Sequence, residues 1–172
     1  TTGSPKLAAQ THGAQVYTAW ASVQMQGLTS SDRTINGYPL FHVAGVLPGS
    51  LACFSAGAEV IIPTTDLFRN KDVIVNFWRL TDHHKPTIMS AVPTVLSALS
   101  DIDLAGADIS SIRYFRTGAA PLREETARRF KERTGLHVHE SLGMTEMTGI
   151  STITPPGVHA NVGHVGFRTP HA

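Results

Sequence analysis

The chain has 172 residues, of which 41% are hydrophobic and 16% are charged, and its formal net charge is +1 at pH 7. This composition excludes an intrinsically disordered chain, because enough apolar surface is available to form a core. The near-neutral charge argues against a broad basic surface for nucleic acid or an anionic membrane.

Residues 1–12, TTGSPKLAAQTH, open the chain. They lack the charged start and long apolar centre of a signal peptide and do not begin with Met, so we expect a piece of a longer protein. The hexamer TTGSPK offers hydroxyl, backbone and ammonium donors that suit phosphate oxygens. It lacks the spacing of a Walker loop, and the alternative is an ordinary frayed terminus.

Apolar runs of strand length alternate with helical patterns over residues 13–150. The expected strands are 35–40, 58–62, 87–92, 112–116 and 137–140, and the expected helices are 14–26, 43–55, 71–83, 93–100 and 121–134. This alternation predicts an α/β fold with a largely parallel sheet flanked by helices. No repeat or linker divides the chain, so we expect one domain that ends in extended segments over 151–172.

The most apolar segment, 43–57, contains Pro48 and is too short to span a bilayer. It predicts a buried helix with the proline near its start or at a kink. Cys53, in the same segment, is the single cysteine of the chain. A disulfide framework is therefore impossible, and a reducing, cytoplasmic location is the simpler expectation.

The helix at 121–134 has clear end signals. Pro121 stands at its start, Glu124 and Glu125 lie in its first turn, and Gly135 follows it. Its many charged residues are typical of a solvated helix face rather than of a binding patch.

Ligands bind to such sheets in the crevice beyond the carboxyl ends of the strands. This rule selects three loops, YPLFHVAG at 38–45, RTGAAPL at 116–122 and ESLGMTE at 140–146. His42, in the first loop, could line a pocket or be an ordinary interior histidine. The GAAP stretch of the second loop could equally be a plain turn between a strand and a helix.

Thr145 and Glu146 place a hydroxyl beside a carboxylate in the third loop. Together they could hold a phosphate oxygen and a magnesium ion, since Mg²⁺ prefers one or two carboxylates plus substrate phosphates. The alternative is a helix start, with Thr145 as the cap and Glu146 in the first turn.

Several common sites are not supported by the sequence. The nine histidines are scattered, with no HExxH and no cysteine partner nearby, which argues against a zinc site. The chain also lacks the GxSxG elbow of serine hydrolases and the GxGxxG fingerprint of dinucleotide-binding folds.

The order of the motifs carries more information than any one of them. From TTGSPK through PLFHVAG, GAEVIIP, SAVPTVLSAL, RTGAAPL and GMTE to VGHVGFRTP, the chain resembles the adenylate-forming, AMP-binding superfamily, in particular acyl-CoA synthetases. The resemblance covers essentially the whole chain. It implies one α/β subdomain of the large N-terminal domain of such an enzyme.

The resemblance also implies a reaction and its cofactors. ATP activates a carboxylic acid, here a fatty or other apolar acid, to an acyl-adenylate with release of pyrophosphate, and the acyl group passes to coenzyme A. ATP or AMP, Mg²⁺ and coenzyme A are the implied cofactors. The implied partners are the acid and the rest of the parent enzyme, with a homo-oligomer as a further possibility.

Site residues follow from matching the motifs of the family position by position. Thr145 matches a phosphate contact, Glu146 matches the magnesium ligand, and His42 matches a residue of the acyl pocket. The implied nucleotide-binding residues are Thr1, Thr2, Gly3, Lys6, Gly118, Ala119, Ala120, Pro121, Glu140, Ser141, Leu142, Gly143, Met144 and Thr145. Phe41, Val92 and Met144, together with His42, suggest a mainly apolar acyl pocket.

The chain departs from the family at Leu142, where a tyrosine or phenylalanine usually stacks on adenine, because leucine has no π-face. It also has no counterpart of the family's ribose-binding aspartate, hinge arginine or C-terminal lysine, so we expect the 172 residues to be inactive alone. Two alternatives remain open. One is an adenylation domain for amino acids, which usually has FDxS in place of LFHVAG, or for aryl acids. The other is a non-catalytic nucleotide-binding or interaction domain.

Overall fold

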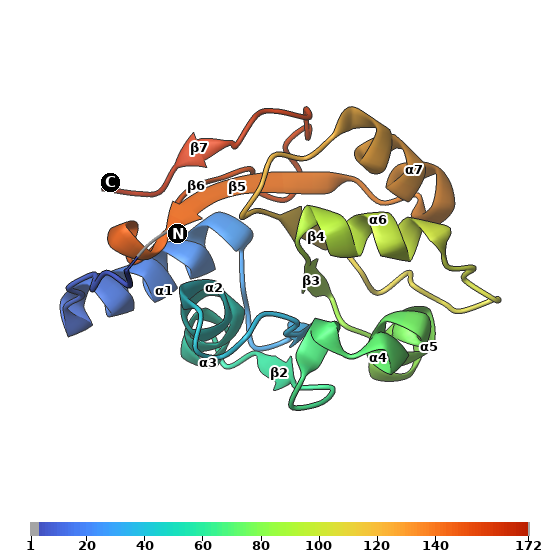
Figure 1. Ribbon diagram of the computed structural model, residues 1–172, viewed down its shortest axis with the longest axis horizontal. Coiled ribbons are helices and arrows are strands. Elements are labelled where there is room, and N and C mark those ends of the chain that lie inside the picture. The colour runs from blue at the N-terminus through green and yellow to red at the C-terminus, as the bar shows by residue number, and fades with distance from the viewer. Residues whose placement is uncertain (1–3, 172) are drawn as a thin grey trace.

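A seven-stranded sheet organises the chain in a computed structural model that describes residues 4–171 (Figure 1). Across the sheet the strands follow the order β2-β1-β3-β4-β5-β6-β7. The strands are β1 Arg33–Ile35, β2 Glu59–Ile61, β3 Ile88–Ser90, β4 Tyr114–Thr117, β5 Val138–Met144, β6 Gly149–Ile153 and β7 Phe167–Arg168. The first five strands are parallel to one another, whereas the pairings of β5 with β6 and of β6 with β7 are antiparallel. The predicted α/β fold with a largely parallel sheet is confirmed.

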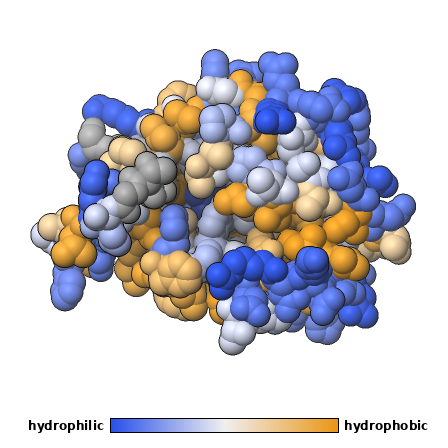
Figure 2. All heavy atoms as spheres, viewed as in Figure 1, coloured by the Kyte–Doolittle hydropathy of each residue, from blue (hydrophilic) through white to orange (hydrophobic). Residues whose placement is uncertain are grey.

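Helices cover both faces of this sheet. They are α1 His12–Gln26, α2 Val43–Val46, α3 Ala52–Ser55, α4 Lys71–Val75, α5 Phe77–His84, α6 Pro93–Asp101 and α7 Glu124–Thr134. Figure 1 shows α1, α2 and α3 on the left of the sheet and α4 to α7 on its right. Figure 2 shows hydrophilic side chains gathered over α7, in keeping with its exposed ion pairs from Arg128 to Glu125 and Glu132. No helix in residues 4–171 is long and apolar enough to cross a membrane.

Each face of the sheet has its own core, because successive residues of a strand point to opposite faces. Met89 and Phe115 pack into the larger core, under α4 to α7, where Phe115 meets Phe130 with ring centroids 4.8 Å apart. Ile88 and Tyr114 pack into the smaller core, under α1 and α3. Both faces are thus buried, as is usual for parallel strands.

Cys53 lies in the smaller core with 4% of its surface exposed. Burial raises the pKa of its thiol to about 11, so the side chain is protonated and uncharged at neutral pH. It contributes to the structure as a small apolar side chain.

The first strand is shorter than the sequence predicts. It ends at Ile35 instead of extending over 35–40. Asn36 is buried, its amide nitrogen donates to the Gly45 carbonyl and the Ser50 hydroxyl, and its side-chain oxygen accepts from the Tyr38 N–H. These bonds draw the chain out of the sheet, since asparagine side chains compete with the ladder for backbone partners.

Two helix predictions need correction, one because the helix is interrupted and one because it begins later than predicted. The predicted helix 71–83 divides at Asn76, whose side chain donates to the Asp72 carbonyl at 2.8 Å. The predicted helix 121–134 begins only at Glu124, because Arg123 has extended backbone angles at the N-cap. The segment 43–55 is helical throughout, with a π-helical turn over Leu47–Leu51 at Pro48, which confirms a proline-associated irregularity.

The predicted strand 137–140 continues to Met144, and the sequence did not predict its antiparallel partner β6 as a strand. A 3₁₀ turn over Thr145–Met147 joins the two. The alternation of polar and apolar residues is weak here, which explains why this hairpin was missed.

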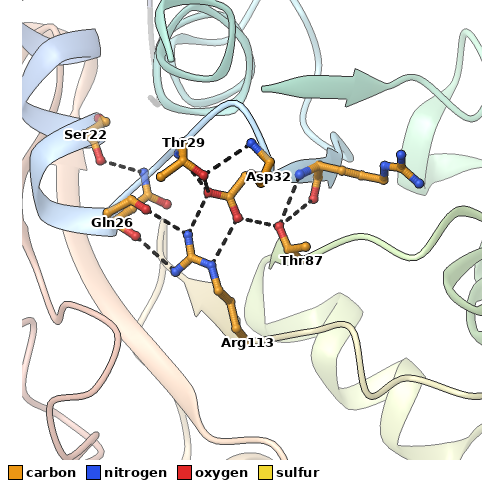
Figure 3. Close-up of polar contacts among 9 residues, drawn as sticks. Ser22, Gln26, Thr29, Asp32, Thr87 and Arg113 are labelled. Atoms are coloured by element: carbon orange, nitrogen blue, oxygen red, sulfur yellow. Dashed lines mark hydrogen bonds and ion pairs between the residues drawn. The ribbon is translucent and has the colours of Figure 1, made fainter. Parts of the chain in front are cut away.

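An ion pair between the buried Asp32 and the partly exposed Arg113 holds the amino-terminal ends of three neighbouring strands together (Figure 3). Arg113, just before β4, donates from Nε and Nη2 to the two carboxylate oxygens of Asp32 at 3.0 and 2.9 Å. Thr87, just before β3, donates to Asp32 Oδ1 at 2.6 Å, and the Thr29 N–H donates to Oδ2 at 2.8 Å. The guanidinium also donates to the carbonyls of Gln26 and Gly27 at the end of α1.

We predict that Asp32→Asn lowers the free energy of unfolding by about 1–3 kcal/mol, because the neutral amide cannot accept all the hydrogen bonds that the buried carboxylate accepts. Urea unfolding of the wild type and the variant measures this loss. Asp108→Asn is the matched control, since Asp108 pairs with Lys85 on the exposed surface and should matter much less. Equal losses in the two variants would contradict a special role for Asp32.

Asp32→Asn should also change how the free energy of unfolding depends on pH in acid. Burial raises the pKa of Asp32, but its hydrogen bonds from Arg113, Thr87 and Thr29 outweigh burial and hold the pKa below its ordinary value. Its contribution is therefore present above pH of about 4 and is lost as the pH falls through the folded pKa. Asp32→Asn should flatten the decline in stability that the wild type shows below that pH.

Candidate functional site

A cavity of about 260 Å³ opens at the carboxyl ends of β1, β4 and β5. All three loops selected from the sequence contribute to its wall. The lining residues are Tyr38, His42, Val43, Ala44, Pro48, Arg116, Gly118, Ala119, Ser141, Gly143, Met144, Thr145, Glu146, Gly149 and Ile150. The position agrees with the rule that places ligands at this edge of a parallel sheet.

The cavity gathers many of the residues predicted to form a site, but not all of them. The predicted residues on its wall are His42, Gly118, Ala119, Ser141, Gly143, Met144, Thr145 and Glu146. Lys6, Ala120, Pro121, Glu140 and Leu142 are absent from the wall. Thr1, Thr2 and Gly3 lie outside the residues that the structure describes.

Of the four residues suggested for a mainly apolar pocket, His42 and Met144 line the cavity, whereas Phe41 and Val92 do not. Phe41 is 83% exposed and does not line the cavity. Val92 lines a separate hollow of about 300 Å³, which shares only Tyr38 with the first. Arg116 and Ser141 are polar members of the wall, so this cavity combines apolar and polar surface.

The loop after β1 is held by the buried Asn36 and presents His42 at the start of α2. The His42 Nδ1 atom accepts a hydrogen bond from the Ala44 N–H at 3.1 Å and so caps the helix. A neutral ring with Nδ1 as acceptor carries its proton on Nε2. His42 therefore offers an N–H donor to a ligand while its other nitrogen fixes the ring.

The turn after β4 brings backbone close to the cavity. A Cβ on Gly118 would lie 2.9 Å from the Ser141 hydroxyl oxygen, so only glycine fits there without a shift. Ala119, the next residue, has a φ of 72°, in the left-handed region that non-glycine residues rarely adopt. Such strain is commonly found at ligand sites, where the surrounding structure maintains it.

The third part of the wall is the end of β5 with the 3₁₀ turn that follows. Met144 occupies the N-cap position of this turn, and Thr145 and Glu146 form its first two residues. The alternative in which Thr145 caps a helix is therefore wrong. Gln10 donates from Nε2 to the Thr145 carbonyl at 2.8 Å, which places the amino-terminal segment beside this turn.

Glu146 has an exposed carboxylate with no hydrogen bond or ion pair to any residue between 4 and 171. The same residues contain no group of three His, Cys, Asp or Glu side chains that could hold a metal ion. The donor set thus does not fit a metal cage made of protein alone. It fits Mg²⁺ that takes one carboxylate and completes its shell with phosphate oxygens and water.

Glu140 and Leu142 do not line the cavity, and their predicted nucleotide contacts stay predictions. Glu140 is 6% exposed, and its Oε1 atom accepts from the Gly163 N–H at 2.6 Å. It anchors the segment that follows β6 and does not face the cavity. Leu142 is 45% exposed and also lies off the wall, so its side chain gives no support for a stacking role there.

Arg116 and Tyr38 also line the cavity; each is the first residue of a loop selected from the sequence, but neither was named there as a site residue. Both are buried, with exposed fractions of 5% and 8%. Burial raises the pKa of Tyr38, so its hydroxyl remains a proton donor at neutral pH. A charged residue near the end of an otherwise apolar strand, as in YFRT, was the signal available for Arg116.

Residues 1–172 match the family described as AMP-binding enzyme. The chain is 32% identical over 176 residues to the marinolic acid–CoA ligase of Pseudoalteromonas sp. (strain SANK 73390), with 99% of this chain and 27% of that protein covered. It is 30% identical over 174 residues to the indoleacetate–CoA ligase of Aromatoleum aromaticum, with 99% and 32% covered.

A solved structure has the same fold. The anthranilate CoA ligase AuaEII in complex with anthranoyl-AMP superposes with a TM-score of 0.84 at 29% identity, with 98% of this chain and 32% of that chain covered. The chain belongs to the AMP-binding enzyme family, as its motifs predicted. It spans about a third or less of the length of these relatives.

We predict that Gly143→Ala destabilises the chain by about 1–3 kcal/mol through overpacking. A Cβ at this position would lie 2.2 Å from the Gly149 carbonyl oxygen and would push β6 away from β5. Thermal unfolding checks this. Gly13→Ala is the matched control, because its Cβ meets nothing closer than 3.8 Å and alanine favours a helix. Similar destabilisation by both changes would contradict the prediction.

Proposed function

We propose that the protein containing this chain activates a carboxylic acid with ATP and transfers the acyl group to coenzyme A. The single observation that carries the proposal is the cavity at the carboxyl ends of three parallel strands. The Thr145 hydroxyl and the Glu146 carboxylate lie on its exposed side, and its buried side offers space for a small acid. Family membership and the adenylate bound to a related ligase agree with this assignment.

The first step joins two anions, so it needs charge neutralisation and alignment. A carboxylate oxygen of the acid attacks the α-phosphorus of ATP, and the bond from that phosphorus to the pyrophosphate oxygen breaks. In the second step the thiolate of coenzyme A attacks the acyl carbon, and AMP leaves.

We assign a separate role in this reaction to each part of the cavity wall. We assign the Thr145 hydroxyl to a phosphate oxygen and the backbone of Gly118 and Ala119 to the border between the nucleotide and the acyl group. His42 would hold the acid near its reacting carboxylate through Nε2–H, since Nδ1 is occupied by the Ala44 N–H. Lys6 is exposed and lies in the same amino-terminal segment as Gln10, which contacts the turn at Thr145.

Magnesium, when bound, supplies positive charge that offsets the charges of the phosphates. Glu146 is the residue we assign to it, because its carboxylate is exposed on the cavity wall and has no partner in the described chain. We further propose that the protein acts in the cytoplasm and that residues 1–172 alone lack the activity.

Aryl acids are a second candidate class of substrate. The related indoleacetate and anthranilate ligases are named for aromatic acids, and the cavity wall includes Tyr38, Pro48 and Ile150, which suit a flat ring. A fatty or other apolar acid is the substrate class that the family resemblance implies.

We predict that the full-length protein catalyses acid-dependent exchange of labelled pyrophosphate into ATP. The measurement uses a panel of alkyl acids, aryl acids and amino acids, with release of AMP after addition of coenzyme A as the second readout. Exchange with amino acids alone would support an amino-acid adenylation domain instead. Exchange with no acid would support a non-catalytic nucleotide-binding protein and end the proposal.

Glu146→Gln in the same protein should raise the Mg²⁺ concentration for half-maximal exchange at least about tenfold, because a ligand of the ion is lost. A titration of exchange rate against Mg²⁺ measures this. Glu124→Gln is the control, since Glu124 lies on α7 away from the cavity wall and should leave the titration unchanged. An unaltered titration in Glu146→Gln would remove the assigned metal role.

A further inference from the structure

Arg116 places a positive charge inside the cavity. It lies on β4 two residues after Tyr114, so it shares the face of the sheet that packs against α1 and α3. Its side chain belongs to the cavity wall, yet only 5% of the residue is exposed. The guanidinium is therefore deep in the protein and still next to the space that a ligand could fill.

The partners of this guanidinium do not balance its charge. Nη1 donates to the Ser141 hydroxyl at 3.3 Å, and Ser141 in turn donates to the Thr117 carbonyl at 3.0 Å. The Nε atom is buried and has no hydrogen-bond partner among the described residues. No carboxylate in residues 4–171 forms an ion pair with Arg116. A buried cation in this state is costly unless an anion completes it.

The depth of Arg116 separates it from the proposed phosphate position. Thr145 and Glu146, assigned to the phosphates and their metal, are exposed. The buried members of the wall are Tyr38, Pro48, Ser141, Gly149 and Ile150 together with Arg116. An anion that reaches Arg116 would leave water and lie beside apolar surface, where charge-assisted hydrogen bonds are strong.

We propose that Arg116 recognises a second anionic group on the acid substrate, such as the far carboxylate of a dicarboxylic acid or a sulfonate. This inference rests on the proposed acid activation and specifies its substrate class. One carboxylate would react near His42 and Thr145, and the other group would pair with the guanidinium. A planar guanidinium with a free Nε can offer two parallel N–H donors to such a group.

The test compares matched acids in the full-length protein by pyrophosphate exchange. Each dicarboxylic acid of four to six carbons is paired with the monocarboxylic acid of the same length. Wild-type kcat/KM should be higher for the diacid. Arg116→Met should lower the diacid value about 10- to 100-fold, mainly through KM, because a charged hydrogen bond is lost, and should leave the monoacid value equal or higher.

Further variants distinguish recognition from folding. Arg116→Lys keeps the charge and should retain part of the preference for the diacid. Arg128→Met, on the exposed surface of α7, is the matched control and should leave both values unchanged. Melting temperatures of all variants are measured with and without the diacid, and the diacid should raise the value for the wild type but not for Arg116→Met.

The following outcomes would overturn the inference. A wild-type preference for monoacids, or an equal loss for both acids in Arg116→Met, would do so. A rise in the KM for ATP alone would assign Arg116 to the nucleotide instead. If the wild type exchanges with monoacids only, the proposed function stands and this inference fails. If it exchanges with no acid at all, both fail.

Discussion

The pair formed by Asp32 and Arg113 is the interaction on which the arrangement of the sheet depends. Arg113 immediately precedes β4, and Asp32 immediately precedes β1, so two bonds of 3.0 and 2.9 Å set where both strands begin. Thr87 adds the start of β3 to the same carboxylate. Because these three strands run in parallel from a common start, their carboxyl ends point to the opposite edge of the sheet, where the loops after β1 and β4 contribute to the cavity wall.

The residues that stabilise the sheet and the residues that line the cavity thus lie at opposite edges of the same sheet. At the amino-terminal edge a buried carboxylate has its charge matched and most of its acceptor sites filled. At the carboxyl-terminal edge a buried guanidinium has one hydroxyl partner and an unsatisfied nitrogen. Unfilled hydrogen-bonding capacity costs stability, and a ligand in the cavity would supply the partner that this guanidinium lacks.

The sequence predicted the class of fold, the family and the three loops because these depend on periodicity and on motif order. It could not predict the end of β1, because that end depends on hydrogen bonds from the Asn36 side chain to Gly45 and Ser50. These two residues lie in the helical segment that follows, and strand periodicity does not reveal such contacts. Motif matching placed Glu140 among the nucleotide-binding residues, but it could not predict that the Gly163 N–H donates to that carboxylate. Arg116 was missed because strand periodicity does not reveal whether a buried charge has a partner.

The single thiol of the chain has a practical consequence. Cys53 is shielded under α1, and its raised pKa of about 11 leaves almost no thiolate at neutral pH. Alkylating reagents and oxidants can therefore reach it only when the layer of α1 to α3 separates from the sheet. The rate at which Cys53 is alkylated therefore measures how often that layer opens. The same layer carries His42 and one wall of the cavity.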